Sequence, residues 1–432
     1  MAPPCKVAVI GAGVGGLTAA RAIRAEGLHV TVYEKSDRLG GVWIYDPRVE
    51  SDPLGLDPNR ETVHSSIYPS LRTNLPRQLM GFPDYPFGSR SKNPDSRIFP
   101  GHQEVLDFIK GYADFFQLVE LIRFNTEVER VEQAGPEWVV QSRLTSSGSV
   151  SEEMFDAVVV CSGHYSQPRL AQIPGMEKWP GEQIHSHNYR GPEPFQDKIV
   201  VVIGSGPSAI DISAEIAEAA KEVHLSSRAP DTTATKLDFG DNIWQHSKIE
   251  FLDESGLVSF EDGACLFPDI IFHCTGYHYS FPFLKTDGIV SVDDNRVGPL
   301  YKHIFPPKLA PSLSFVGLAF RAVVVQLLHF QATWIARVLS SKTNLPSEEE
   351  MQADVERHYQ LMELKGIPKH YTHAFSLETF FEYIDSIAVE AGLEQVGEEV
   401  KSICKSYFSF VIENGLWKAK NWRPDWELQQ GN

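Results

Sequence analysis

The chain has 432 residues, 42% of them hydrophobic and 22% charged, and this length favours two or three domains that each bury a core. A formal net charge of -18 argues against nucleic acid or an anionic membrane as a partner, because both bind basic surfaces. The most apolar long window, 322–339, is interrupted by Gln326, His329, Gln331 and Arg337. We therefore expect a buried amphipathic helix there and no membrane span. The N-terminus shows no signal-peptide pattern, so we expect a cytoplasmic protein.

The cysteines are odd in number and scattered, and they form no C-x-x-C pair. A zinc ribbon and a dithiol redox centre are thereby disfavoured, and no metal site is predicted. Scattered thiols are typical of a reducing compartment. The five residues are Cys5, Cys161, Cys265, Cys274 and Cys404.

A first βαβ pattern opens the chain. An apolar strand over 7–10 leads into a glycine-rich turn, a helix pattern to Glu26 and a second strand over 29–33 that Glu34 closes. The spacing is that of a dinucleotide-binding unit, in which the turn approaches a pyrophosphate and an acid follows about 20 residues later. The turn consists of Gly11, Ala12, Gly13, Val14, Gly15 and Gly16.

A second copy follows the same order. The strand 199–203 precedes a turn, a helix pattern to Ala220 and a strand over 223–225 that leads to Arg228. The two copies together predict an α/β fold with two Rossmann-like, dinucleotide-binding domains. The second turn consists of Gly204, Ser205, Gly206, Pro207, Ser208 and Ala209.

Two further apolar strands, 156–161 and 269–274, each lead to a glycine, Gly163 and Gly276. We interpret these glycines as the points where the chain crosses between domains, with the second unit inserted into the first. The first domain is then expected over 1–168 and 283–432, and the inserted domain over 169–282.

Two loop-like segments, 46–58 and 81–101, are expected to pass over a cofactor pocket, because loops of this length are often functional. The aromatic residues Phe82, Tyr85 and Phe87 either line an entry to that pocket or pack the core of the loop.

The residues that end the second strands assign a nucleotide to each copy. Glu34 accepts hydrogen bonds from a ribose diol and repels a 2′-phosphate, whereas the Arg228 guanidinium attracts one. We therefore expect FAD on the first copy and NADPH on the second, with each diphosphate at a helix N-terminus. The alternative for Arg228 is an ordinary surface arginine.

Several motifs in fixed order resemble those of the flavin-containing monooxygenase family, and especially its plant S-oxygenase branch. The segment 179–189 matches the family fingerprint F-x-G-x-x-x-H-x-x-x-[YF], with Trp179 in place of phenylalanine and His185 at the histidine. Further matches are Gly40-Gly41-Val42-Trp43, Thr73-Asn74-Leu75-Pro76 and Cys274-Thr275-Gly276-Tyr277.

The resemblance implies a set of cofactor contacts. Asn74 would lie over the flavin ring and act in catalysis, and we interpret His185 as a linker between domains. The FAD contacts implied are Gly11, Gly13, Val14, Gly15, Gly16, Glu34, Lys35, Gly41, Val42, Trp43, Thr73, Asn74 and Leu75. Those implied for NADPH are Gly204, Ser205, Gly206, Ser208, Ala209, Asp211 and Arg228.

The resemblance also implies a reaction. NADPH reduces the flavin, the reduced flavin captures O2 as a C4a-hydroperoxide, and a soft nucleophile, above all a small thioether, takes one oxygen to become a sulfoxide. The Asn74 amide would hydrogen-bond the oxygenated flavin without delivering a proton. The alternative is that Asn74 only shapes the turn before Pro76.

Other functions fit the sequence less well or stay open. A disulfide reductase would need a cysteine pair, and Tyr189 disfavours Baeyer–Villiger oxygenation. N-oxygenation, auxin-type decarboxylation and a non-catalytic FAD-binding role stay open, although the intact second unit argues against the last. The sequence departs from the branch at His329, and the residues after Ser340 carry no transferable motif; oligomeric state is not indicated.

Overall fold

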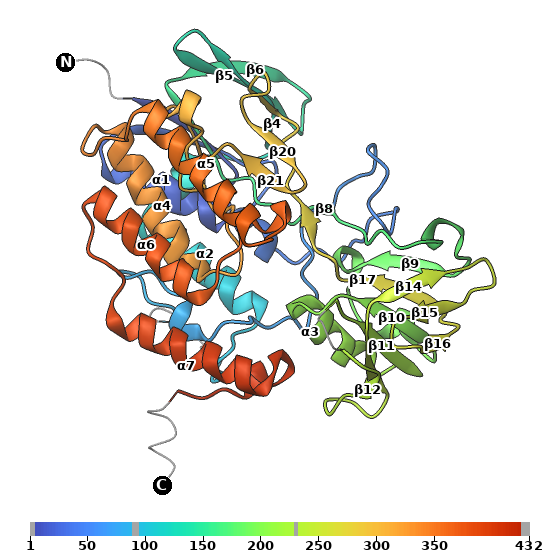
Figure 1. Ribbon diagram of the computed structural model, residues 1–432. Helices are drawn as coiled ribbons and strands as arrows, with labels where there is room; N and C mark the ends of the chain where they lie inside the picture. The colour runs from blue at the N-terminus through green and yellow to red at the C-terminus, as the bar shows by residue number, and fades with distance from the viewer. Residues whose placement is uncertain (1–4, 89–94, 229–231, 425–432) are drawn as a thin grey trace.

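The computed structural model describes residues 5–88, 95–228 and 232–424, so part of the predicted loop 81–101 lies outside the described residues. Two mainly parallel sheets divide these residues into two lobes, which Figure 1 shows side by side. We call the lobe with the five-stranded sheet the first lobe and the one with the six-stranded sheet the second lobe. The fold class is the predicted one, α/β with two Rossmann-like units.

The sheet of the first lobe is entirely parallel, in the order β22-β7-β1-β2-β3. The central strand β1 is apolar after Lys6, and its neighbour β7 is apolar throughout, because helices cover one face of the sheet and a second sheet covers the other. The helices α1 (Val14–Ala25) and α4 (Val324–Leu339) pack together on this sheet. The strands are β1 (Lys6–Ile10), β2 (His29–Tyr33), β3 (Ile122–Arg123), β7 (Ala157–Val160) and β22 (Leu313–Phe315).

A four-stranded sheet, β19-β4-β5-β6, covers the other face of the first lobe. Trp138 and Phe155 are fully buried between the two sheets. Four more helices belong to the first lobe, and α6 packs on α4. These elements are β4 (Thr126–Ala134), β5 (Glu137–Leu144), β6 (Val150–Phe155), β19 (Leu284–Lys285), α2 (His102–Phe115), α5 (Glu348–Leu364), α6 (Leu377–Ala391) and α7 (Glu398–Asn414).

The sheet of the second lobe has the order β12-β13-β11-β10-β17-β9 and is parallel except at the β12–β13 edge. The helix α3 (Pro207–Ile216) covers one face, and a small antiparallel sheet covers the other. The strands are β9 (Glu182–His185), β10 (Ile199–Ile203), β11 (Glu222–Ser226), β12 (Thr235–Lys236), β13 (Ile243–His246), β17 (Ile270–His273), β14 (Ile249–Leu252), β15 (Val258–Phe260) and β16 (Cys265–Leu266).

A two-stranded ribbon of β8 (Gln167–Pro168) and β18 (Tyr277–His278) lies between the lobes, near the label β8 in Figure 1. The predicted boundaries at 168/169 and 282/283 lie at or just beyond this ribbon, and they stay predictions. A hairpin of β20 (Ser291–Asp293) and β21 (Arg296–Gly298) follows it.

The strands over 29–33 and 199–203 have the predicted bounds, whereas the helix after the second glycine turn ends at Ile216 instead of Ala220. The reason is a tertiary cap. The Asn242 amide donates to the carbonyls of Ala217, at 3.0 Å, and Ala220, at 2.9 Å, which satisfies two carbonyls that have no N–H partner within the helix.

The apolar window 322–339 forms the buried helix α4, as predicted, with Trp334 and Ile335 fully buried. Across the described part of the chain, no helix combines the length and the apolar character needed to cross a bilayer.

Candidate functional site

The first glycine turn follows β1 and leads into α1. Gly11 has a φ of +103°, and a Cβ placed on it would lie 2.6 Å from the carbonyl oxygen of Cys161. A Cβ on Gly16 would lie 1.8 Å from the Gly11 oxygen, so the helix rests directly on the turn. No residue larger than glycine fits at either position. The N-cap of α1 is Gly13, which supplies no side-chain hydrogen bond to the first N–H groups of the helix.

Glu34 follows β2 and lies beside the first glycine turn. We call the turn 11–16 together with Glu34 the first cradle, and the turn 204–209 together with Arg228 the second cradle. The buried carboxylate of Glu34 accepts from the Ala12 N–H at 2.9 Å through Oε2, and from the N–H and hydroxyl of Ser36 at 2.9 and 2.8 Å through Oε1. The Ala12 N–H uses one lone pair of Oε2, and the other stays available to a ribose hydroxyl. The neighbouring Lys35 is exposed.

A further turn, at Gly40 and Gly41, packs against the first glycine turn. The Gly40 N–H donates to the Ala12 oxygen at 3.0 Å, and a Cβ on Gly41 would lie 3.0 Å from the Cα of Gly13. The short helix η1 (Gly41–Trp43) thus begins beside the N-terminus of α1. The structure brings this predicted FAD segment and the first glycine turn together.

The segment containing Asn74 is held by its neighbours. The Thr73 N–H donates to the Pro100 oxygen at 3.0 Å, and the Thr73 hydroxyl donates to the Leu75 oxygen at 2.7 Å. Thr73 is buried and Leu75 half-buried, whereas Asn74 is exposed. The carbonyl of Asn74 accepts a hydrogen bond of 2.6 Å from the Tyr407 hydroxyl.

The second cradle has the same strand–turn–helix geometry as the first, except that its third motif position is alanine and not glycine. Gly204 has a φ of +141°, and its Cβ would lie 2.5 Å from the Cys274 oxygen. The third motif position is Ala209, which is fully buried between α3 and the sheet. A Cβ on Gly206 would meet no protein atom within 4 Å, so the space in front of the helix N-terminus is open. Ser205 and Ser208 are exposed beside it.

Arg228 follows β11 and is exposed. Its charge acts on Arg169, whose pKa is lowered by burial and, further, by the nearby Arg228 guanidinium. Arg169 donates to the Thr275 oxygen through Nε at 3.1 Å and a second nitrogen at 2.9 Å, which holds it at the end of β17. Two guanidinium groups near the carboxyl ends of parallel strands form a positive surface suited to an anion.

Asp211, which the resemblance places near NADPH, forms an ion pair with the C-terminal segment. Its Oδ2 accepts from the Lys420 ammonium at 2.8 Å, and Lys420 belongs to the C-terminal segment. No sequence motif indicated this contact, because the two residues are far apart in the chain and ordinary in type.

His185 of the fingerprint is fully buried, with both ring nitrogens in hydrogen bonds. The His187 N–H donates to its Nδ1 at 3.1 Å, so its Nε2–H donates to the Gly276 oxygen at 3.0 Å. Burial lowers the pKa of His185 to about 3. The ring is thus neutral and joins the fingerprint to the interlobe ribbon.

The sequence did not indicate a buried ion cluster next to this histidine. Arg60 donates to Glu50 Oε2 at 2.6 Å, and His187 Nε2 lies 3.2 Å from Glu50 Oε1. Burial raises the pKa of Glu50, but the hydrogen bonds from His187 and Arg60 outweigh it and leave the pKa below its usual value. The cluster fastens the predicted loop 46–58 to the fingerprint, and only tertiary contacts reveal it.

The loop aromatics pack inward, which is the second of the two predicted alternatives. Phe82 stacks on Tyr112 of α2 with ring centroids 4.5 Å apart, and Tyr85 is buried against the same helix. Phe87 is half-buried on Phe108.

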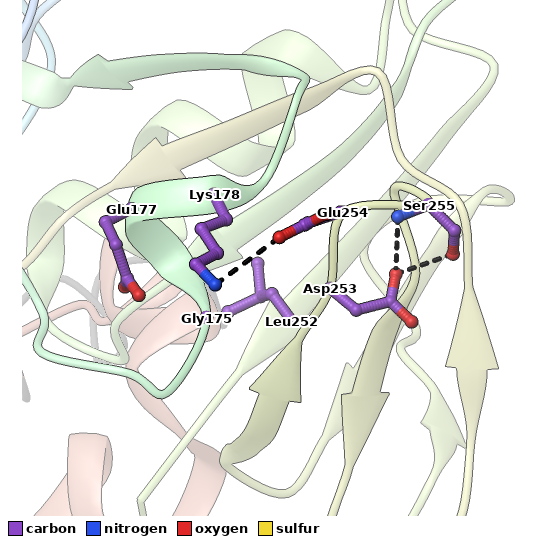
Figure 2. Close-up of a pocket in the computed structure, with 7 residues that line it drawn as sticks. All are labelled: Gly175, Glu177, Lys178, Leu252, Asp253, Glu254 and Ser255. Carbon is purple, nitrogen blue, oxygen red and sulfur yellow. Dashed lines mark hydrogen bonds and ion pairs between the residues drawn. The ribbon is translucent and has the colours of Figure 1, made fainter.

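A surface pocket of the second lobe lies apart from both glycine turns (Figure 2). Lys178 and Glu254 form an ion pair of 3.4 Å there, and the Asp253 carboxylate accepts from the N–H and hydroxyl of Ser255. None of the predicted site residues lines it. The lining residues are Gly175, Glu177, Lys178, Leu252, Asp253, Glu254 and Ser255.

Comparison with known proteins agrees with this geometry. Residues 4–240 and 239–396 match the model of the flavin-binding monooxygenase-like family. In Arabidopsis thaliana, flavin-containing monooxygenase FMO GS-OX-like 2 is 48% identical over 97% of this chain and 92% of its own length. FMO GS-OX4 of the same plant is 50% identical over 90% of this chain and 85% of its own length.

Among solved structures, S-allyl-L-cysteine S-oxygenase from Allium sativum superposes with a TM-score of 0.95 and 48% identity, over 99% of this chain and 97% of that one. Tmm from Pelagibacter sp. strain HTCC7211 superposes with a TM-score of 0.81 at 24% identity, over 96% of this chain and 93% of that one, which shows the fold alone.

Two cradles of the Rossmann type and a family match over most of the chain define a flavoprotein monooxygenase with FAD and NADPH as cofactors. The chain belongs to the flavin-binding monooxygenase-like family. Within that family its relatives are the glucosinolate S-oxygenase-like monooxygenases of plants.

Proposed function

We propose that the protein is an NADPH- and O2-dependent S-oxygenase that converts a small thioether to its sulfoxide. The observation that carries the proposal is the similarity, over nearly the whole chain, to an enzyme named for oxygenating the sulfur of S-allyl-L-cysteine. A thioether sulfur is a soft, polarizable nucleophile, so it suits an electrophilic oxygen donor.

The first cradle fits FAD. The remaining lone pair of Glu34 Oε2 can take a ribose hydroxyl, and the uncapped N–H groups of α1 can take the diphosphate. Gly13 leaves the backbone bare at the point of approach, and η1 lies beside it with Val42 and Trp43. When bound, FAD supplies the chemistry that accepts a hydride and activates O2.

The second cradle fits NADPH. The open space before Gly206 admits a diphosphate, and the exposed Arg228, with Arg169 near it, offers positive charge for a 2′-phosphate. Ser205 and Ser208 are exposed at the same turn and can donate hydroxyl hydrogen bonds.

Asn74 is proposed to act on the flavin by hydrogen bonding. Its amide is exposed on a turn whose flanks are held by Thr73, so it is free to face a bound ligand. A neutral amide both donates and accepts hydrogen bonds but supplies no acidic proton. Placed at the flavin, it would orient the reacting region and exclude water without protonating it.

The decisive experiment measures sulfoxide formed per NADPH consumed by the purified protein, with S-allyl-L-cysteine and other thioethers offered in turn. A ratio close to one for at least one thioether supports the proposal. An amine and a 2-oxo acid serve as comparison substrates for N-oxygenation and decarboxylation. Protein that binds FAD but is not bleached by NADPH would instead be a non-catalytic flavoprotein. A cytoplasmic location and a small-molecule substrate are part of the same proposal.

A further inference from the structure

The C-terminal segment, for which the sequence offers no motif, lies against both lobes. It consists of α7 and the short helix η9 (Leu416–Asn421), which we together call the C-terminal strap, residues 398–421. Figure 1 shows α7 running along the first lobe toward α3 of the second lobe. The helix η9 packs on both α7 and α3.

On the first lobe, the strap reaches the candidate catalytic turn through Tyr407. The ring of Tyr407 is 2% exposed, and it packs against Phe99, with centroids 5.9 Å apart, and Trp422, at 5.6 Å. Its hydroxyl donates to the carbonyl oxygen of Asn74 at 2.6 Å. Burial raises the pKa of Tyr407, so the hydroxyl keeps its proton and remains a donor.

On the second lobe, the same strap contacts α3 and the loop after β12. Lys420 pairs with Asp211 of α3 at 2.8 Å, and Lys418 pairs with Asp238 at 2.9 Å. These contacts fix the strap on the helix that begins at the second glycine turn. The strap therefore connects the turn that carries Asn74 with the cradle proposed for NADPH.

The hydrogen bond from Tyr407 acts on the peptide plane between Asn74 and Leu75. The flanks of the turn are held by Thr73. This plane begins at the Asn74 Cα, from which the side chain projects, so a movement of the plane also changes the direction of the side chain. A carbonyl fixed by a buried donor prevents that movement. A shift of about 1 Å in a positioned group can cost about a hundredfold in rate.

We propose that Tyr407 is a positioning residue for Asn74: it holds the Asn74 carbonyl so that the amide faces the bound flavin. The proposal rests on the function proposed above for Asn74. It gives the C-terminal strap a role in keeping oxygen transfer coupled to NADPH consumption, although Tyr407 itself touches neither substrate nor cofactor.

The test is Tyr407→Phe, which keeps the ring and removes only the donor. We expect hydrogen peroxide released per NADPH to rise roughly 3- to 10-fold and kcat for sulfoxide to fall, while KM for NADPH stays unchanged, because Lys420 still contacts α3. A second readout needs no turnover. Hydrogen–deuterium exchange should become faster in the peptide over 71–79 and stay unchanged elsewhere in the first lobe.

The matched control is Tyr301→Phe, which also removes a tyrosine hydroxyl, one that donates to Glu390 at 3.0 Å. It should lower Tm without releasing peroxide. Peroxide release that follows Tm in both variants would reduce Tyr407 to a structural residue and overturn the proposal. Unchanged coupling and unchanged exchange over 71–79 in Tyr407→Phe would also overturn it.

Failure of the underlying function has a different signature. If the wild-type protein forms no sulfoxide, or if Asn74→Ala stays fully coupled, the role of Asn74 is wrong. The exchange measurement then still decides whether Tyr407 restrains the Asn74 turn, and unchanged exchange refutes that restraint as well.

Discussion

The contacts that an added Cβ would make distinguish two kinds of glycine. Some are required by the fold, and others are expected to be required by a ligand. A Cβ on Gly16 or Gly204 would overlap a backbone oxygen, whereas a Cβ on Gly206 meets no protein atom. The φ of Gly206 is -83°, which any residue adopts. We therefore propose that a ligand approaching closely from outside the chain is what requires glycine at position 206, and this can be tested without harming the fold.

We predict that Gly206→Ala keeps the Tm and FAD content of the wild type but weakens NADP+ binding by about tenfold or more, equivalent to about 1.4 kcal/mol. Isothermal titration with NADP+ measures the effect. Gly204→Ala is the control, because its Cβ would lie 2.5 Å from the Cys274 oxygen and should lower Tm instead. Wild-type affinity in Gly206→Ala would show that no diphosphate passes there.

Arg228 carries the prediction about coenzyme choice. Removing a charge-assisted hydrogen bond to phosphate costs about 1.5–3 kcal/mol, so Arg228→Ala should raise KM for NADPH roughly 10- to 100-fold and leave KM for NADH nearly unchanged. Initial rates of flavin bleaching with the two coenzymes measure this. An unaltered preference for NADPH would make Arg228 an ordinary surface residue.

For Asn74, replacement by alanine should leave FAD bound but divert most NADPH to hydrogen peroxide. The amide is exposed and its turn is held by backbone bonds, so the side chain can be removed without loss of Tm. Peroxide and sulfoxide are measured in the same reaction. Tight coupling would support the alternative that Asn74 only shapes the turn.

At the scale of elements, the strands and turns of the two cradles could be predicted because local signals coincide there. Continuous apolar runs, glycine spacing and a closing Glu34 or Arg228 all indicate one βαβ unit. The end of α3 could not be predicted, because its cap is the distant Asn242. The strap could not be predicted either, since its function depends on one tyrosine hydroxyl and two lysines that look ordinary in the sequence.

The turn after β21 and the segment before α6 meet through two buried histidines. The Val297 N–H donates to His373 Nε2 at 3.1 Å, so His373 carries its proton on Nδ1 and donates it to His303 Nδ1, also at 3.1 Å. The pair is satisfied only while both rings are neutral. Burial lowers the pKa of His373 to about 3 and that of His303 far below its usual value.

This pair predicts acid sensitivity. Unfolded histidine titrates near 6.5, so below that pH the unfolded chain binds protons that the folded pair refuses, and stability falls as pH decreases toward 3. Each histidine contributes up to about 1.4 kcal/mol per pH unit. Urea unfolding at pH 7, 6 and 5 should show a smaller loss of stability in His373→Gln than in the wild type. Parallel pH profiles would contradict the role of the pair.

Across the whole molecule, the sequence could predict two dinucleotide-binding units and the cofactors FAD and NADPH, but not how the lobes are held together. The assignment of one cofactor to each cradle stays a prediction. The lobes are held together by side chains whose spacing in the sequence gives no signal. Examples are the buried Glu50–Arg60–His187 cluster and the Lys420–Asp211 pair. These contacts join segments more than 100 residues apart in the chain. The family fingerprint marked the place of His185, and the structure shows that its ring hydrogen-bonds backbone on both sides.

The strand order of the first lobe has a consequence for biosynthesis. β22 is the edge strand of the five-stranded sheet and pairs with β7. This sheet is therefore incomplete until residue 315 has left the ribosome. By then every strand of the six-stranded sheet has been synthesised. Domains generally fold as units during translation. We therefore expect that, in nascent chains arrested near residue 300, the second cradle is protected from protease while the first is still cleaved. The second lobe would then fold before the first, although its sequence is translated later.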